Sequence, residues 1–185
     1  PSEGWIYADS LIEDKREIKR SILNGDYESV VGKIVVSKDD VVYIPSGTLH
    51  ALTRGSLVYE IQQSTDITYR FFDYNRLDND GKLRDLHLDD AIENLNTENR
   101  VKISAFPKDT LVSEQPYTMV RKTLENVYHN TTDVAVAITV SKGSMCVDGH
   151  SILTGMSILV LPNETISISQ AAEEVVIATP KLYFK

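Results

Sequence analysis

The amino-acid sequence predicts a mainly β protein with two short helical segments. Residues 101–185 are a succession of short β-rich runs separated by turn residues, and residues 33–61 have the period of strands. Helical periodicity is confined to two stretches within the first hundred residues. Many short strands at regular spacing are typical of a β-sandwich or a β-barrel. We therefore expect a β architecture with helices only near its first part.

The chain opens with a short strand and a helix. Trp5 to Ala8 are apolar and predict a strand. Residues 11–24 predict a helix, because Leu11, Ile18 and Ile22 fall on one helical face and Gly25 follows as a stop signal. Residues 27–31 are compatible with a further helical turn.

The stretch from residue 41 to residue 76 combines strand patterns with reactive side chains. The apolar run Val41 to Ile44 meets the turn Pro45-Ser46-Gly47, and His50 follows on a second apolar piece. Alternation then resumes through residues 57–61. A strand, a Pro-Gly turn and a returning strand would direct the histidine into a cupped sheet.

Further strands would bring three more polar side chains, Glu60, Arg70 and Arg76, to the same concave face. Together with His50 they supply a metal-type ligand, a carboxylate and two guanidinium groups. This set is suited to sugar-phosphate chemistry.

Structural roles are also open for each candidate when the residues are considered alone. His50 could be a hydrogen-bonded strand histidine, and Glu60 could merely orient Arg70. Arg70 could pair with Asp66 or Asp73, and Arg76 could lie in a solvated turn.

The remaining residues predict a loop, a helix and a β-rich half. Residues 78–81 are a turn signal, and a helix is expected at about 88–95, where Asp89 and Asp90 favour its N-terminus. We expect this helix to bridge two lobes. Seven short β-rich runs follow, at residues 101–105, 118–127, 134–140, 144–147, 157–161, 165–169 and 174–179.

The composition excludes several classes of partner. The chain has 185 residues, 42% hydrophobic and 25% charged, with a formal net charge of −8, which disfavours nucleic acid but permits a small anionic ligand. Its single cysteine, Cys146, excludes an internal disulfide and a cysteine-built zinc site. No membrane-spanning run or signal peptide is visible, so we expect a cytoplasmic protein. The sequence does not indicate an oligomeric state.

Two motifs resemble known families. Residues 39–54 resemble the second motif of the cupin superfamily, a jelly-roll barrel, with Pro45, Gly47 and His50 at its proline, glycine and metal-binding histidine. Asp39 and Arg54 replace a glycine and an asparagine of that motif. The longer pattern IPSGTLHAL, YEIQQSTDITYRFFDYNR and DGKLRDLHLDDAIE resembles the bacterial type I phosphomannose isomerases, or mannose-6-phosphate isomerases.

This resemblance covers about the first hundred residues well and the β-rich remainder loosely. It implies zinc-dependent interconversion of mannose 6-phosphate and fructose 6-phosphate through an enediolate. It also implies that His50 is a zinc ligand, that Arg70 and Glu60 are catalytic, and that Arg76 contacts the substrate phosphate. The family's other zinc ligands would lie upstream of the segment that matches residue 1, so we expect this chain to be an incomplete, inactive portion.

The expected organisation follows from the resemblance. Residues 1–76 would be the C-terminal part of a catalytic cupin with an inserted helix, residues 77–100 a loop and bridging helix, and residues 101–185 a degenerate cupin-like β lobe. Two other functions are open: a non-catalytic sugar-binding cupin module, and another cupin metalloenzyme such as an oxygenase.

Overall fold

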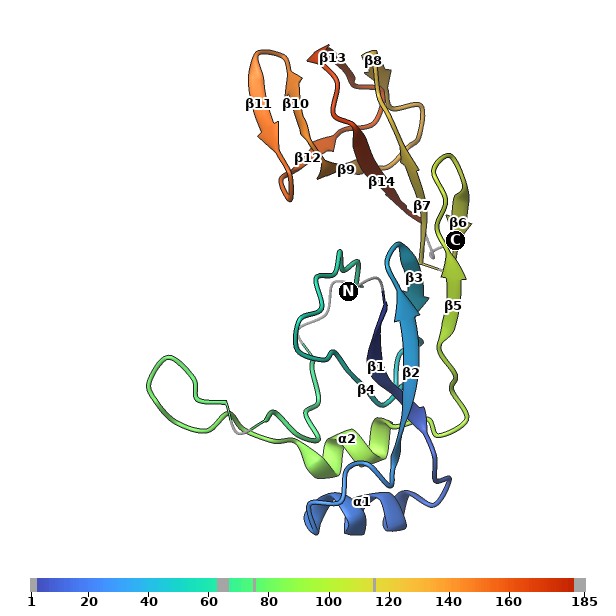
Figure 1. Ribbon diagram of the computed structural model, residues 1–185, viewed down its shortest axis with the longest axis vertical. Coiled ribbons are helices and arrows are strands. Elements are labelled where there is room, and N and C mark those ends of the chain that lie inside the picture. The colour runs from blue at the N-terminus through green and yellow to red at the C-terminus, as the bar shows by residue number, and fades with distance from the viewer. Residues whose placement is uncertain (1–2, 63–66, 75, 115, 182–185) are drawn as a thin grey trace. The chain divides into compact units, whose positions relative to one another are not determined.

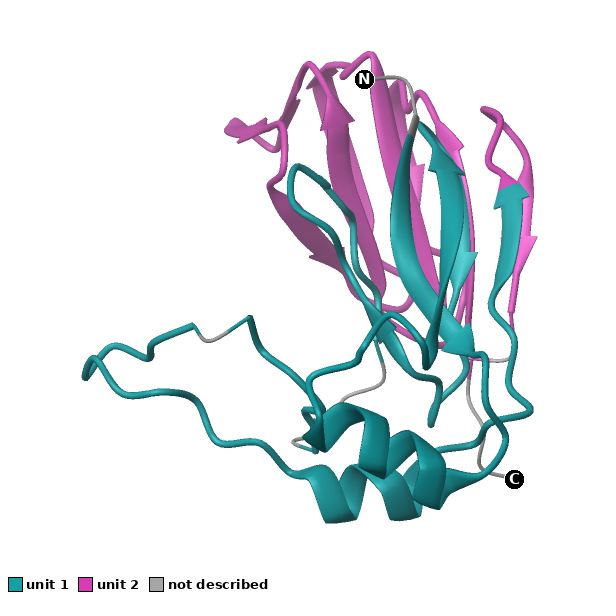
Figure 2. Ribbon diagram, turned by 60° about the horizontal axis from the view of Figure 1, so that its bottom comes forward, with its two compact units in different colours: residues 1–104 teal, residues 105–185 magenta. Residues whose placement is uncertain are grey.

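The structure is a computed structural model that describes residues 3–62, 67–74, 76–114 and 116–181 (Figure 1). Two compact units make up the chain, residues 1–104 and residues 105–185 (Figure 2). The described residues form mainly antiparallel strands with two helices, which confirms the predicted mainly β class. Neither helix is long and apolar enough to cross a membrane.

A three-stranded antiparallel sheet forms the centre of the first unit. Strand β1 (Glu3–Ser10) pairs with β2 (Val31–Ser37) on one side and with β4 (His50–Ala51) on the other. Ile6 and Ala8 are buried on one face of β1, as the alternation of a strand requires. Ala8 lies opposite His50 in the register of β1 and β4. A separate pair joins β3 (Asp40–Tyr43) to β5 (Lys102–Ala105).

Helix α1 (Lys15–Leu23) is shorter than the predicted helix over residues 11–24. It begins where the Asp14 side chain accepts a hydrogen bond from the Arg16 backbone N–H, which caps the first turn. Leu11 therefore lies outside the helix and is exposed. Ile18 and Ile22 are buried as predicted, in a core that also contains Val30 and Leu95.

Residues 28–30 form a single turn before β2 and do not continue the helix. Gly25 adopts a φ of 77°, in the left-handed region that ends helices, so a new nucleus would be needed to restart one.

Helix α2 (Leu88–Asn94) belongs to the first unit and packs beside α1. The Lys15 Nζ donates to the Glu93 carbonyl at 2.9 Å, and Lys19 forms an ion pair with Asp89. Ala91 and the following Leu95 are buried. The segment before α2 extends as a long arm away from the strands of this unit (Figures 1 and 2).

The expected strands after His50 are absent from the described residues. β4 ends at Ala51, residues 52–62 and 67–74 contain no strand, and Leu57 is 99% exposed. Instead of a ladder, the Thr53 hydroxyl donates to the Trp5 carbonyl, and the Ser56 N–H donates to the Thr53 carbonyl in a turn. Alternation predicts a strand only where a partner strand and an apolar layer exist, and residues 57–61 have neither in the described structure.

The second unit contains two antiparallel sheets. The four-stranded sheet has the order β11 (His150–Leu153), β10 (Ser144–Val147), β13 (Thr165–Gln170) and β8 (Asn126–His129). The five-stranded sheet has the order β12 (Ser157–Val160), β9 (Val136–Lys142), β14 (Glu174–Pro180), β7 (Tyr117–Lys122) and β6 (Leu111–Ser113).

The predicted runs of this half correspond to strands, with two differences. The run at residues 118–127 is split into β7 and β8 around Leu124, which is buried in the core. β6 and β11 were not predicted, since only one residue of each, Val112 and Ile152, is buried. The core contains thirteen buried side chains drawn from both sheets and their connections: Leu124, Val136, Ile138, Val140, Met145, Val147, Ile152, Val160, Ile166, Ile168, Ala172, Val175 and Ile177.

Asn130 is a buried polar residue of the second unit whose hydrogen bonds are all made within the protein. Its side chain is fully buried, and its Nδ2 donates to the carbonyls of Val134, Val160 and Leu161 at 2.8–3.0 Å. Its Oδ1 accepts from the backbone and hydroxyl of Thr132. A buried amide is stabilising only when satisfied in this way.

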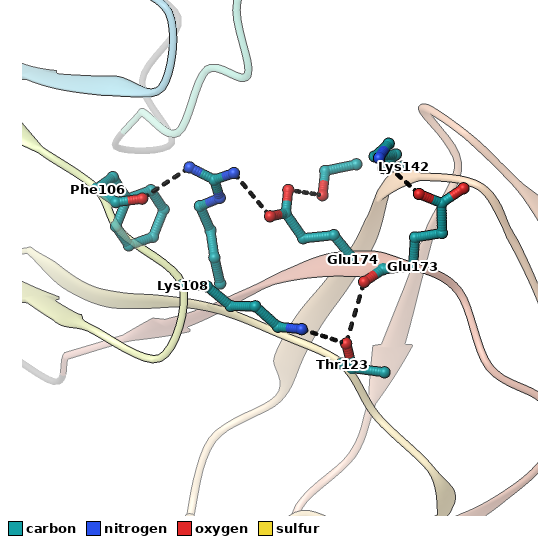
Figure 3. A network of polar contacts seen from close by, with 8 residues as sticks. Phe106, Lys108, Thr123, Lys142, Glu173 and Glu174 are labelled. Carbon is teal, nitrogen blue, oxygen red and sulfur yellow. Dashed lines mark hydrogen bonds and ion pairs between the residues drawn. The ribbon is translucent and has the colours of Figure 1, made fainter.

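A polar network crosses β7, β9 and β14 (Figure 3). The Arg121 guanidinium donates to Glu174 at 2.6 Å and to the Phe106 carbonyl at 2.7 Å, and Ser141 donates to the other Glu174 oxygen. Burial raises the pKa of Glu174, but these hydrogen bonds from Arg121 and Ser141 outweigh it and lower the pKa below its usual range. Glu174 therefore contributes to stability as a carboxylate.

Candidate functional site

His50 follows a tight turn that fixes its backbone. The Thr48 N–H and hydroxyl both donate to the Pro45 carbonyl, at 3.2 and 2.6 Å. Gly47 adopts a φ of 79°, a conformation that residues with a Cβ rarely adopt. The predicted Pro-Gly turn before the histidine is therefore confirmed.

The residues after α2 hold this turn from outside. The Asn96 N–H donates to the Gly47 carbonyl at 2.8 Å, and the Asn99 amide donates to the Ser46 carbonyl and the Thr48 hydroxyl. A Cβ at Gly47 would lie 2.8 Å from the Asn94 carbonyl oxygen. Only glycine allows this close approach between the turn and the end of α2.

The His50 ring is exposed, and its Nδ1 lies 2.9 Å from the Thr48 carbonyl oxygen. A neutral imidazole with its proton on Nδ1 donates there and leaves the Nε2 lone pair available, as in metal-bound histidines. A zinc site needs at least three protein ligands. The structure, where it describes the chain, contains no group of three or more His, Cys, Asp or Glu able to hold a metal ion. His50 thus fits one ligand position, while the described residues do not form a whole zinc site.

Glu60 lies in the strandless segment and is exposed. Within the described residues no hydrogen bond or ion pair joins Glu60 or His50 to Arg70 or Arg76. Asp66, the second possible partner of Arg70, lies outside the described residues.

Aromatic packing fixes the segment that carries Arg70. Phe71 packs against the core of the first unit, where Leu49, the neighbour of His50, also packs. Phe72 stacks on Tyr27 with 4.2 Å between ring centres. The backbones next to His50 and Arg70 are therefore attached to one hydrophobic core.

Asp73 contacts one predicted arginine, Arg76, and one that was not predicted, Arg84. Its Oδ1 accepts hydrogen bonds from Nε and Nη2 of Arg76, and its Oδ2 lies 3.2 Å from Nε of Arg84. Hydrogen bonding from Arg76 lowers the pKa of Asp73, burial opposes this, and the charges of Arg76, Arg84 and the half-buried Arg70 lower the pKa further. Asp73 is therefore ionised and pairs with two guanidinium groups, those of Arg76 and Arg84.

Sequence reasoning missed Arg84 and considered Asp73 only as a structural partner of Arg70. The turn predicted at residues 78–81 is a signal that could have pointed to Arg84. In the structure the Asp78 N–H donates to the Lys82 carbonyl and Leu77 bridges Leu83 across this turn. This hairpin reverses the chain direction, so that Arg84 lies beside Asp73, the ion-pair partner of Arg76.

His87 precedes α2, and its N–H donates to the Arg70 carbonyl at 3.0 Å. Its buried Nδ1 has no hydrogen-bond partner within the described structure.

A separate pocket of about 290 Å³ lies on the first unit, lined by Tyr7, Leu11, Glu28, Val31 and Lys33. None of the predicted site residues lines it.

The fold and these residues describe a mainly β protein with a histidine after a Pro-Gly turn and two arginines paired with a buried carboxylate. A solved structure of this fold, the mannose 6-phosphate isomerase from Bacillus subtilis, matches with a TM-score of 0.71 and 24% identity. The match covers 97% of this chain and 61% of that chain.

Bacterial proteins named as known or probable mannose-6-phosphate isomerases are similar in sequence to part of this chain. The probable mannose-6-phosphate isomerase GmuF of Bacillus subtilis (strain 168) is 47% identical over 79 residues, 43% of this chain and 25% of that protein. ManA of the same organism is 44% identical over 79 residues, with the same shares of the two chains. The mannose-6-phosphate isomerase of Streptococcus mutans is 41% identical over 81 residues, 44% of this chain and 26% of that protein. No family model matches the sequence.

The chain is therefore homologous to mannose-6-phosphate isomerases over about 43% of its length. The matched segment spans about a quarter of the length of these curated relatives.

Proposed function

We propose that this chain is part of an enzyme that interconverts mannose 6-phosphate and fructose 6-phosphate through an enediolate, with zinc as cofactor. The observation that carries the proposal is the 41–47% identity to proteins named mannose-6-phosphate isomerases. In this proposal residues 1–76 are the C-terminal part of a catalytic cupin domain. Residues 77–100 are a loop and a helix that connect it to a second β lobe, residues 101–185. The single cysteine is consistent with a cytoplasmic enzyme.

The reaction moves a proton between C1 and C2 of the sugar phosphate. Zinc, when bound in the whole protein, would polarise the two substrate oxygens without redox chemistry. His50 would contribute one ligand through Nε2. The contact between Nδ1 and the Thr48 carbonyl supports this role, because it fixes the ring orientation that a ligand needs.

The other candidate residues take roles suited to their chemistry. Arg70 would stabilise the oxyanion that develops on the enediolate, since a fixed guanidinium acts there without reorganisation. Glu60 would transfer the proton as a general base. Arg76 would bind the phosphate through its guanidinium fork.

Replacing Arg70 with alanine tests the assignment in the protein as encoded by its open reading frame. We expect isomerisation to fall by about 100-fold or more, the scale measured for loss of one oxyanion-stabilising donor, while zinc content stays unchanged. Coupled assay of fructose 6-phosphate and metal analysis of the purified variant provide the two measurements. Arg16→Ala is the control, because Arg16 is 95% exposed on α1.

Retained isomerisation in Arg70→Ala would remove this assignment. A wild-type protein that consumes dioxygen would support a cupin oxygenase, and one that binds a sugar without turnover would support a binding module. For the 185-residue chain alone we expect weak or no zinc binding and negligible turnover. Stoichiometric zinc in that chain would contradict the expected ligand set.

A further inference from the structure

Around Asp73 a buried carboxylate is paired with guanidinium groups that are more exposed than the carboxylate. The Asp73 side chain is 9% exposed, whereas the Arg76 side chain is 61% exposed and that of Arg84 is 32% exposed. The anion is thus inside and the cations reach solvent.

The hydrogen-bonding capacity of the cluster is unbalanced. Each guanidinium has five N–H donors, and a carboxylate has about four acceptor positions. Oδ1 of Asp73 accepts from Nε and Nη2 of Arg76, whereas Oδ2 lies 3.2 Å from Nε of Arg84 without a hydrogen bond, so Asp73 uses only a few of the donors of the two guanidinium groups. The N–H groups of the 61% exposed Arg76 that Asp73 does not accept are left for an anion from solvent, and guanidinium groups bind phosphate oxygens in this way.

The charges in direct contact are also unequal in number. The guanidinium groups of Arg76 and Arg84 both pair with the single carboxylate of Asp73, so two positive charges meet one negative charge at this point. A phosphate monoester carries about −1.5 to −2 near neutral pH. The cluster therefore matches a phosphorylated ligand better than a neutral sugar.

The hairpin at residues 76–84 fixes the backbones of Arg76 and Arg84 relative to each other. The Arg76 N–H donates to the Asp73 carbonyl at 2.9 Å, and the Arg84 N–H donates to the Arg76 carbonyl at 3.4 Å. Phe71 and Phe72 attach the start of this segment to the core and to Tyr27. Backbone and side-chain contacts thus converge on Asp73.

We propose that Asp73 is a positioning residue that orients Arg76 and Arg84, and that Arg84 is a second phosphate-binding residue of the site. This inference rests on the proposed function for the identity of the phosphorylated sugar. The recognition of a phosphate group by the cluster itself is testable without turnover.

Two variants test the proposal in the protein as encoded. Asp73→Asn keeps the side-chain shape and removes the anchoring charge. Arg84→Lys keeps the positive charge and removes the fork, and its partly exposed position makes loss of folding a lesser concern. Asp85→Asn is the matched control, because it removes an exposed carboxylate next to Arg84.

We expect Asp73→Asn to raise KM for mannose 6-phosphate by about tenfold or more with a smaller change in kcat, since oriented guanidinium forks bind phosphate. Its inhibition constant for inorganic phosphate should rise by the same factor. Arg84→Lys should shift both constants in the same direction by less, and Asp85→Asn should match the wild type. Circular dichroism melting verifies that each variant is folded.

Unchanged phosphate inhibition and KM in both variants would overturn the proposal. A similar fall in kcat in both variants with KM unchanged would also overturn the proposal, because the residues would then act on the structure of the enzyme and not on phosphate binding. If the wild type does not isomerise the sugar phosphate, the proposed function fails. Calorimetric titration of wild type and variants with inorganic phosphate then decides this inference separately, and equal affinities would reject it.

Discussion

At the scale of single residues, the site depends on positions where the backbone leaves no room for alternatives. Gly47 combines a left-handed φ with a close approach to the Asn94 carbonyl. The sequence predicted the turn from Pro45 and Gly47 because turn chemistry is local. It did not predict the contacts with Asn96 and Asn99, since these residues are about fifty positions away in the chain.

Gly47→Ala tests this local constraint. We expect the free energy of unfolding to fall by roughly 3 kcal/mol, because alanine meets both a strained φ and a backbone clash. Gly55→Ala is a matched control, since Gly55 also has a positive φ, 85°, but an added Cβ there has nothing within 4 Å. It should cost only about 1 kcal/mol. Urea unfolding of the three proteins measures the difference, and equal losses in the two variants would show that the contact with Asn94 has no energetic role.

At the level of helices and strands, the sequence predicted those elements that are specified by their own residue pattern and do not depend on a partner distant in the chain. Helix α1 was predicted from its apolar face, and most strands of the second unit from their β-rich runs. The strand expected through Leu57 failed because alternation does not show whether another strand lies beside it. The pairing of Arg76 with Asp73 could be read from their spacing, but Arg84 required the hairpin to be folded.

The pairing of β7 with β14 gives a prediction about pH. Because Glu174 has a lowered pKa, its stabilising effect is complete above the pKa of the unfolded chain and disappears as the pH falls through the folded value. Glu174→Gln should reduce the free energy of unfolding by about 2 kcal/mol at pH 7, the scale of a hydrogen bond to a charged group. Denaturant unfolding of variant and wild type between pH 7 and pH 3 should show this difference shrinking in acid.

Glu173→Gln is the neighbouring control. Glu173 is 63% exposed and pairs with the exposed Lys142, so its replacement should change stability little at any pH. A Glu174→Gln difference that is the same at pH 7 and pH 3 would contradict an ionised role for Glu174.

At the scale of the whole molecule, each of the two units has a hydrophobic core of its own. Thirteen buried side chains among the described residues of the second unit form one core cluster. In the first unit, large exposed apolar side chains are frequent along residues 52–86, including Leu57, Ile67, Leu77 and Leu83. The mainly β class was predictable because it follows from the number of strand patterns in the sequence. The order of strands within each sheet was not predictable, because it depends on pairing between strands that are distant in the chain.

Residues 105–185 should therefore fold alone. We expect this segment to unfold in a single cooperative thermal transition, because a unit with its own core satisfies the requirement for an independent domain. Circular dichroism of the isolated segment measures the transition, and the same segment with Ile138→Asp, a fully buried position, is the control that should lack it. A non-cooperative signal from the unmodified segment would show that its core does not suffice.

The burial of Asn130 has a practical consequence for producing the protein. Asn130-Thr131-Thr132 matches the acceptor pattern for N-linked glycans, and the nitrogen that would carry the sugar is the one that donates to three carbonyls. Attachment before folding would replace one of the two N–H donors of this nitrogen and place a bulky group inside the second unit. Secretion through a glycosylating host should therefore yield misfolded material, whereas a bacterial host avoids this modification altogether.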